Sequence, residues 1–209
     1  MTFTWRFNTM RPSDKAREPI SGEFFATEAT EKAGEALVRE GIQNSLDARR
    51  DGETVMVRIR VSGKDSAVAR SAVAPFLGGL QEHLRAPGNG LQEIPSDEEN
   101  CPVLVFEDFG TTGLLGDPAE WKPQAGSKNH FYHFFRAEGR SDKGEKDIGR
   151  WGVGKQVFPR SSRINTVFGL TVRSDDRKKL LMGMAVLTRL SQLATCEWRK
   201  SSNIKTGFS

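Results

Sequence analysis

The chain has 209 residues, of which 36% are hydrophobic and 28% charged, and its formal net charge at pH 7 is +4. This length fits one large domain, and no apolar run approaches the roughly 18 residues of a membrane span, which excludes a membrane protein. Cys101 and Cys196 are the only cysteines and lie far apart, which excludes a disulfide framework and a cysteine zinc site.

The first part of the chain is expected to hold a lead-in, a long helix and a strand. Residues 1–26 carry aromatic side chains among turn residues and are interpreted as an extended N-terminal lead-in. Residues 27–52 are predicted to form a helix. Thr27 would cap its start, acidic residues occupy its first turns, and Gly52 would end it. Alternating valine and isoleucine side chains then predict a strand over 55–61.

A helix and a loop are expected to separate this strand from the next. Residues 64–100 are rich in alanine and leucine at first, where Pro75 limits the helix, and rich in turn residues afterwards. The run PVLVFED (102–108) is typical of a short buried strand, and it ends in two acids.

The remaining sequence predicts a long loop, a short helix after Gly154, and two strands at INTVFGLTV and KKLLMGMAVLT. The loop, residues 111–148, shows little periodicity, and loops of this length inside a domain are usually functional or disordered. Between residues 136 and 163, eight basic residues stand against four acidic ones, an excess that would attract a polyanion. We interpret residues 1–209 as a single domain and expect it to be the N-terminal part of a longer protein.

The first motif is REGIQNSLDA (39–48), on the predicted helix. Because an α-helix turns by about 100° per residue, Glu40, Asn44 and Asp47 fall within an arc of roughly 60° and form one polar stripe. Taken alone, such a stripe is typical of an ordinary solvated helix face.

The second motif is FEDFGTTGL (106–114), at the end of the buried strand. An acid followed by glycines suits a tight turn that leaves the backbone open to a ligand, although a plain turn has the same composition. The triplet Asp108-Phe109-Gly110 imitates the magnesium-binding tripeptide of protein kinases. That assignment is rejected because the required glycine loop and lysine do not precede it.

The third motif is IGRWGVGKQ (148–156), whose glycines and lysine indicate backbone N–H groups gathered around a phosphate. It nearly matches the P-loop of many NTPases. However, Gln156 stands where Ser or Thr should hold magnesium, and the preceding segment is polar rather than a buried strand.

In their order and spacing, the three motifs resemble those of the GHKL ATPase superfamily, which includes gyrase B, the large heat-shock chaperones, histidine kinases, MutL and the MORC proteins. The resemblance spans about residues 31–173 and is closest in style to the chaperone and MORC motifs. One departure is an extra residue between Gly110 and Gly113. The resemblance implies a Bergerat-type α/β (α+β) fold, a two-layer sandwich of a mixed, largely antiparallel sheet with helices on one face, and an ATP lid at 111–148.

The resemblance also implies a role for each polar residue of the motifs. Glu40 would be the general base that deprotonates the attacking water, and Asn44 would bind Mg²⁺ through its amide oxygen. Asp47 would line the pocket or support the metal ligand, and Asp108 would accept a hydrogen bond from the adenine amine. The other implied nucleotide-binding residues are Gly110, Gly113, Gly149, Gly152, Val153, Gly154 and Lys155.

The glycines would let backbone amides close on the phosphates, while Lys155 would bring positive charge to the γ-phosphate. Thr188 is a candidate for the threonine that the family places beside the adenine. His130 and His133 lie in the aromatic run NHFYHFFR, which is interpreted as lid packing rather than a metal site.

The resulting prediction is a slow, magnesium-dependent ATPase. Two alternatives stay open: a nucleotide-binding switch or scaffold with little turnover, which Glu40 argues against, and a P-loop NTPase, which Gln156 argues against. The resemblance implies ATP-dependent homodimerisation within a larger machine, with DNA or a protein as client, and phage defence as one setting. The N-terminal sequence MTFTWRFNTMRPSDK lacks the apolar core of a secretory signal, so we expect a cytoplasmic protein.

Overall fold

Antiparallel strands and short helices build an α+β protein. The computed structural model describes residues 4–7, 33–120, 127–137, 154–187 and 194–197. The elements in chain order are β1 (Thr4–Arg6), α2 (Ala33–Asp47), β2 (Met56–Val61), α3 (Arg70–Leu77), α4 (Gln81–Arg85), β3 (Leu104–Phe109), α5 (His130–Phe135), η1 (Gly154–Gln156), α6 (Val157–Arg160), β4 (Thr166–Val172), β5 (Lys179–Ala185) and β6 (Ala194–Glu197). Among these described elements, no helix is both long and apolar enough to cross a membrane.

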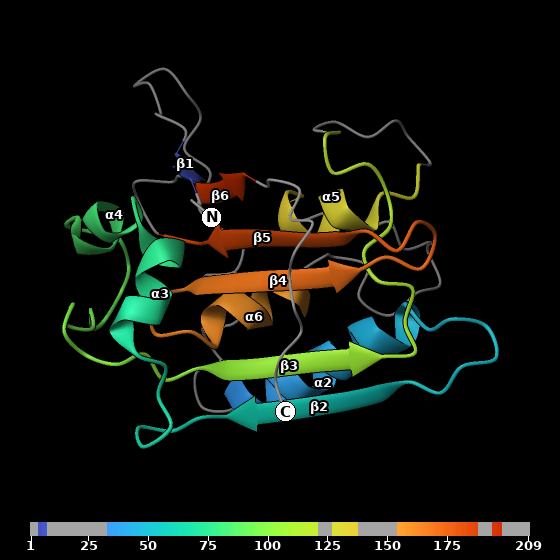
Figure 1. Cartoon of the computed structure of the whole chain (residues 1–209), viewed down its shortest axis with the longest axis horizontal. Coiled ribbons are helices and arrows are strands. Elements are labelled where there is room, and N and C mark those ends of the chain that lie inside the picture. Colours follow the sequence, from blue (N-terminus) through green and yellow to red (C-terminus); the bar gives the residue numbers. More distant parts are fainter. Residues whose placement is uncertain (1–3, 8–32, 121–126, 138–153, 188–193, 198–209) are drawn as a thin grey trace.

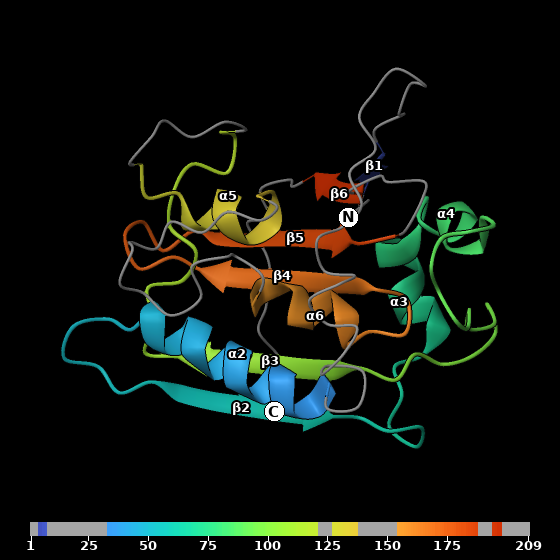
Figure 2. The same cartoon turned by 180° about the vertical axis from the view of Figure 1, so that it is seen from behind.

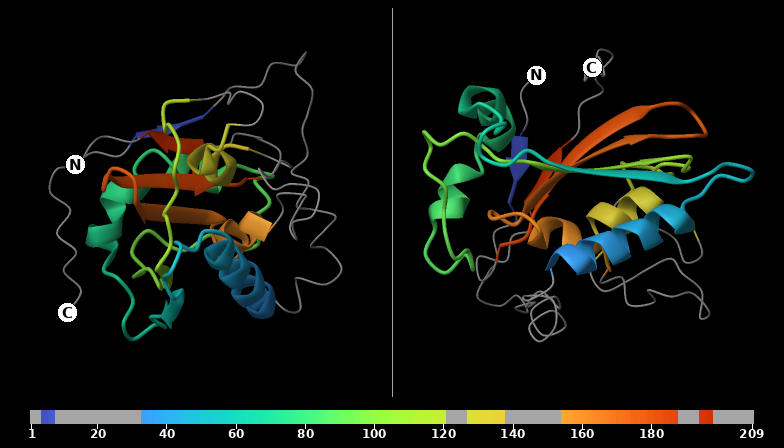
Figure 3. Two further views of the ribbon diagram at one scale, coloured as in Figure 1. Left: turned by 90° about the vertical axis from the view of Figure 1, so that its right-hand side faces the viewer. Right: turned by 90° about the horizontal axis from the view of Figure 1, so that it is seen from below.

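The strands form a four-stranded sheet in the order β1-β6-β5-β4 and a two-stranded sheet of β2 and β3. Figure 1 shows the two sheets side by side in one layer, with α3 and α4 at one end of it. The helices α2, α5 and α6 all cover the same face of this layer, which is turned toward the reader in Figure 2. The edge-on view in Figure 3 shows these helices beneath the strands, so the described part of the chain has two layers.

The two sheets are joined just beyond the end of β3. The amide of Ser174 donates to the carbonyl of Thr112 at 2.9 Å, and the amide of Leu114 donates to Thr171 Oγ1 at 2.8 Å. These hydrogen bonds place the turn after β3 beside the end of β4.

The strands expected at 55–61, 102–108 and in the two late apolar runs are confirmed as β2, β3, β4 and β5. The expected short helix after Gly154 is confirmed as η1 and α6, and the expected helical stretch is confirmed as α3 and α4. The expectation that Pro75 limits this stretch was wrong, because Pro75 lies inside α3 and the two helices are separated at Gly79 (φ +83°). The short strands β1 and β6 were not expected.

The predicted helix is shorter than expected, because α2 ends at Asp47 rather than at residue 52. The chain leaves the helix there because Arg49 forms a β-bridge with Thr111, and the amide of Arg50 donates to the carbonyl of Gly110 at 3.0 Å. Gly52 has a left-handed φ of +76°, but it serves the turn into β2 rather than the end of the helix. Residues 27–32 lie outside the described residues.

The stretch expected to be one long loop contains the helix α5. Asn129 caps this helix, since its Oδ1 accepts from the amide of Tyr132 at 2.9 Å. Phe131 and Phe135 are buried against Leu180, Met182 and Met184 of β5. The expectation that the aromatic run packs against the core is therefore confirmed, whereas its assignment to a loop was wrong.

Candidate functional site

Three of the four buried residues of α2 are small, and this lets the helix lie close to β3. The four are Ala36, Leu37, Gly41 and Ser45. A Cβ atom built on Gly41 would lie only 2.6 Å from Cε2 of Phe106, so the helix and strand approach more closely than any larger residue would allow. Val38, Ile42 and Leu46, on another flank of the helix, are exposed.

This close approach brings the first two motifs together. Ser45 Oγ lies 3.0 Å from Asp108 Oδ2 and also 3.0 Å from the carbonyl of Gly41, so its single proton is shared between two acceptors. The other carboxylate oxygen of Asp108 accepts from Thr111 Oγ1 at 3.2 Å. Ser45 is buried, whereas Asp108 is exposed, so the carboxylate is oriented from the protein side and open to solvent.

The first and third motifs also meet. A Cβ atom built on Gly154 would lie 2.5 Å from Glu40 Oε2, so Gly154 leaves the space that this carboxylate occupies. The other oxygen, Oε1, accepts from Arg39 Nε at 3.2 Å, and the Glu40 side chain is 27% exposed. The carboxylate therefore sits at the start of η1 and keeps access to solvent.

Asn44 lies one turn beyond Glu40 and has a buried Nδ2 atom with no hydrogen-bond partner in the described structure. Asp47, at the end of the helix, accepts from Gln43 Nε2 at 2.8 Å and is exposed. The unpaired atom is a hydrogen-bond donor, so this observation indicates a place for an acceptor at the amide nitrogen rather than a metal ligand at the amide oxygen. Within the described residues, no three His, Cys, Asp or Glu side chains are grouped to hold a metal ion. A Mg²⁺ ion at Asn44 would therefore take most of its ligands from phosphate and water, as this ion commonly does.

Gly110 and Gly113 both have left-handed backbones, with φ of +74° and +68°. A Cβ on Gly110 would collide with the carbonyl of Thr54, and one on Gly113 would lie 2.5 Å from the carbonyl of Val172. Glycine is needed at these positions because the turn packs tightly against its own protein, which differs from the open backbone that the sequence suggested.

Lys155 is buried, and its Nζ atom donates to the carbonyls of His133 and Ala137, at the C-terminal end of α5. A cation there is favourable because the last carbonyls of a helix carry partial negative charge. The structure therefore places the ammonium of Lys155 at the end of α5. The residue of the third motif that lies against Glu40 is Gly154. Four sequence-predicted site residues lie outside the described residues: Gly149, Gly152, Val153 and Thr188.

Searches against protein-family models, curated proteins and solved structures found no match for this chain. The candidate site is therefore defined by the contacts within this chain alone.

The structure adds four residues that the sequence analysis did not select: Gly41, Ser45, Thr171 and Arg173. The spacing of Leu37, Gly41 and Ser45 at every fourth position indicates a buried stripe in which the last two side chains are small. Thr171 and Arg173 gave no comparable signal, because their partners lie in a loop remote in sequence.

Proposed function

We propose that this chain binds ATP with Mg²⁺ and hydrolyses it, using the Bergerat-type two-layer sandwich that its resemblance to the GHKL ATPases implies. One observation supports this more than any other: α2 contacts both other motifs, through Ser45 with Asp108 and through Glu40 with Gly154. Ser45 and Asp108 are 63 positions apart in the sequence. Ser45 lies on the buried side of α2, so the same helix orients Asp108 from one side and carries the polar stripe on another.

The contacts suggest what each residue does. Glu40 would take the proton of the attacking water on its solvent-accessible carboxylate, and Asn44 would bind the metal through its amide oxygen. Mg²⁺, when bound, supplies positive charge to the phosphate oxygens. Asp108 would accept a hydrogen bond from the adenine amine, because each of its oxygens keeps a free lone pair beside the bond from Ser45 or Thr111.

The P-loop alternative needs the ammonium of Lys155 on a phosphate. In this structure the same ammonium is held by the carbonyls of His133 and Ala137, and only the four-residue helix α6 follows η1. Because the GHKL resemblance gives Lys155 a phosphate role as well, the position of its ammonium does not separate the two arrangements. The shortness of α6 argues against the P-loop, whose glycine loop opens a longer helix.

The proposal is tested by titrating the protein with MgATP in a calorimeter and by measuring phosphate release. Glu40→Ala should bind ATP nearly as the parent does but lose turnover, because a general base acts on the reaction rather than on binding. Asp108→Asn should weaken binding roughly tenfold to a hundredfold, as expected when a charge-assisted hydrogen bond is lost. Glu35→Ala is the matched control, since Glu35 lies exposed in the first turn of the same helix.

Three results would contradict the proposal. If millimolar MgATP gave no heat with the parent protein, ATP binding itself would be excluded. Parental turnover by Glu40→Ala would remove the role of Glu40 as the general base. Loss of binding in Lys155→Ala, together with normal binding in Asp108→Asn, would favour the P-loop.

A further inference from the structure

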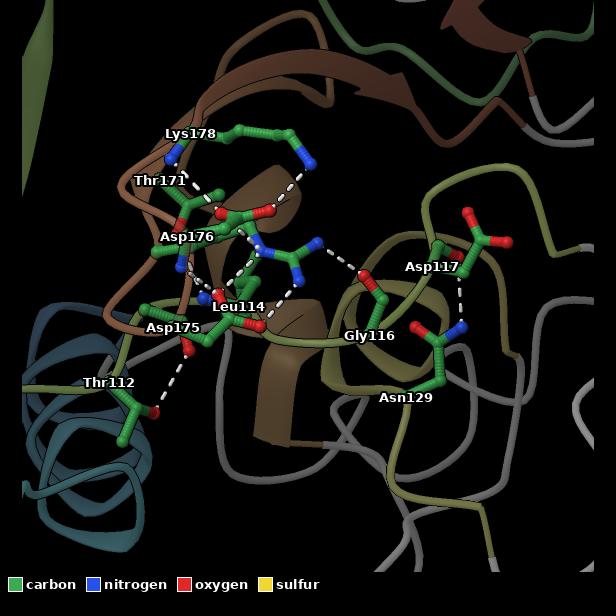
Figure 4. A network of polar contacts seen from close by, with 11 residues as sticks. Thr112, Leu114, Gly116, Asp117, Asn129, Thr171, Asp175, Asp176 and Lys178 are labelled. Carbon is green, nitrogen blue, oxygen red and sulfur yellow. Dashed lines mark hydrogen bonds and ion pairs between the residues drawn. The ribbon is translucent and has the colours of Figure 1, made fainter.

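The turn between β4 and β5 contains the buried Arg173, whose guanidinium donates hydrogen bonds from Nε, Nη1 and Nη2. Arg173 Nη1 donates to the carbonyl of Gly116 at 2.5 Å, while Nε and Nη2 donate to the two carboxylate oxygens of Asp175 at 3.0 and 2.6 Å. Asp176 Oδ1 lies 3.2 Å from Nε, and its other oxygen pairs with Lys178. Figure 4 shows this arrangement, in which the guanidinium joins two acids of its own hairpin to the carbonyl of a distant loop.

The same loop is held at two further points. Its residues 112 and 114 make backbone hydrogen bonds with Ser174 and with the buried hydroxyl of Thr171, at 2.9 and 2.8 Å. With Arg173 on Gly116, every second residue of the segment 112–116 is fastened to the β4–β5 hairpin. This segment begins immediately after the turn that carries Asp108.

The far end of the loop is fixed to α5. A Cβ on Gly116 would collide with Asn129, and Asn129 Nδ2 donates to the carbonyl of Asp117 at 2.9 Å (Figure 4). The amide of Phe131 donates to the carbonyl of Leu115 at 3.0 Å. The segment therefore links the Asp108 turn to the helix whose last carbonyls hold Lys155.

We propose that Arg173 is a positioning residue of the nucleotide site, which holds the segment 112–116 and thereby fixes the Asp108 turn for the nucleoside half of the ligand. This inference rests on the proposed ATP binding. Burying a guanidinium costs free energy unless its donors are satisfied, and here it is satisfied by one carbonyl and a bidentate carboxylate. Lysine offers a single ammonium without the planar fork and cannot reproduce the three directions.

The test compares Arg173→Met and Arg173→Lys with the parent, in calorimetry with MgATP and ADP and in steady-state hydrolysis. Both variants should bind ATP and ADP more weakly by the same factor, roughly tenfold, as expected for the loss of a charged hydrogen bond that positions the loop. At saturating ATP, kcat should stay within about twofold of the parent, because an interaction shared by ground and transition states changes KM alone. Arg163→Met is the control: Arg163 is an exposed arginine whose ion pairs are with Glu93 and Glu99.

Amide hydrogen exchange supplies a readout that does not depend on nucleotide. In Arg173→Met the amides of Leu114 and Ser174 should lose protection, while amides paired between β2 and β3 keep theirs. Asp175→Asn, which keeps the side-chain shape and weakens only the charge-assisted pair, should change both readouts in the same direction by a smaller amount. This milder variant keeps the test decisive if Arg173→Met does not fold.

The outcomes separate the two proposals. If the parent binds no nucleotide, the proposed function fails and the role of Arg173 in it fails with it, whatever the exchange shows. If the parent binds ATP but the variants bind equally well, or if Leu114 keeps its protection, only the positioning role is overturned. A fall in kcat without a rise in KM would also overturn it.

Discussion

At the scale of single residues, the site depends on a serine that has one proton and two acceptors. Ser45 Oγ lies at the same distance from Asp108 Oδ2 and from the carbonyl of Gly41, one turn back along α2. A serine can bond back to its own helix with little loss, so the bond to Asp108 is the one that orients a functional side chain. Its burial keeps water from the hydroxyl, whereas the Asp108 carboxylate stays exposed to solvent.

Ser45→Ala should therefore weaken ATP binding with little effect on folding. The helix keeps its backbone bonds and gains a better helix former, while Asp108 loses one of its two protein donors. We expect the Kd for MgATP to rise by about threefold to tenfold, corresponding to one net hydrogen bond. Calorimetry measures this, and an unchanged Kd with a lowered Tm would assign Ser45 to packing alone.

The acid beside Arg173 gives a prediction about pH. The hydrogen bond from Arg173, together with its charge, lowers the pKa of the Asp175 carboxyl from 3.8 to about 2. Because this carboxyl is more acidic in the folded protein than in the unfolded chain, its stabilising contribution is complete above pH 3.8 and is lost as the pH falls toward 2. Thermal unfolding across that window should show a smaller fall in Tm for Asp175→Asn than for the parent, and equal falls would contradict the linkage.

At the scale of elements, α2 approaches β3 closely at Gly41, where a Cβ atom would lie 2.6 Å from the ring of Phe106. A glycine inside a helix is unfavourable by itself, so its presence is explained by the strand beneath it. Gly34, in the first turn of the same helix, has no neighbouring atom within 4 Å of where a Cβ would stand. The two glycines thus form a natural matched pair.

Gly41→Ala and Gly34→Ala should change stability in opposite directions. The new methyl group at Gly41 would lie 2.6 Å from the Phe106 ring and must displace it, which we expect to lower the free energy of unfolding by about 1–3 kcal/mol. At Gly34 the substitution adds helix propensity and should raise it by up to about 1 kcal/mol. Denaturant unfolding measures both, and stabilisation by Gly41→Ala would contradict the packing.

Sequence patterns predicted the elements that alternation or capping residues define. The strands β2 and β3 have clear apolar runs, and the turn at Gly110 follows directly from its residue types. The strands β1 and β6 were missed because each is short and they pair with each other across nearly the whole chain, Thr4 opposite Glu197. No local pattern encodes such a partner.

The site shows the same contrast between what local sequence patterns predict and what long-range contacts decide. Asp108 was selected because a polar residue at a strand end is visible in one sequence, and its partner Ser45 was not, because that contact exists only after α2 packs on β3. Lys155 was given a phosphate role from its neighbours in the motif, whereas its contacts are set by the end of α5. Residue types predict which groups are available, and tertiary packing decides which of them meet.

At the scale of the whole molecule, the described residues of the three site motifs, which for the third motif are 154–156, gather on the helical side of a single layer of strands. Ser45 and Asp108 link α2 to the two-stranded sheet, while Ala36 and Leu37 pack with Val157 of α6, which leads into the four-stranded sheet. A ligand that touched both groups of residues would connect parts of the fold that are otherwise joined by a few contacts.

MgATP should therefore stabilise the folded protein as a whole. A ligand that binds only the folded state at a hundred times its Kd adds about 2.7 kcal/mol to the free energy of unfolding. We expect an increase in Tm with MgATP for the parent and for Glu40→Ala, and a clearly smaller increase for Asp108→Asn at the same nucleotide concentration. A rise in Tm for Asp108→Asn equal to that of the parent would show that the nucleotide binds without this carboxylate.

The junction between the sheets also determines how the fold comes apart. In the described residues no ladder of strand pairing runs from β3 to β4, and the seam consists of the bonds from Thr171, Arg173 and Ser174 to the segment 112–116. We expect the antiparallel pair of β2 and β3 to separate with α2, below the energy of global unfolding, only once this seam, the α2–α6 packing and the ring contact of Phe106 with Phe158 open. The segment between the two strands can stay behind, because α3 and α4 pack with Trp5 and Leu187. Asp108 would leave with α2 and the two strands and Gly154 would stay behind, so a partly opened molecule would lose its site before it lost most of its secondary structure.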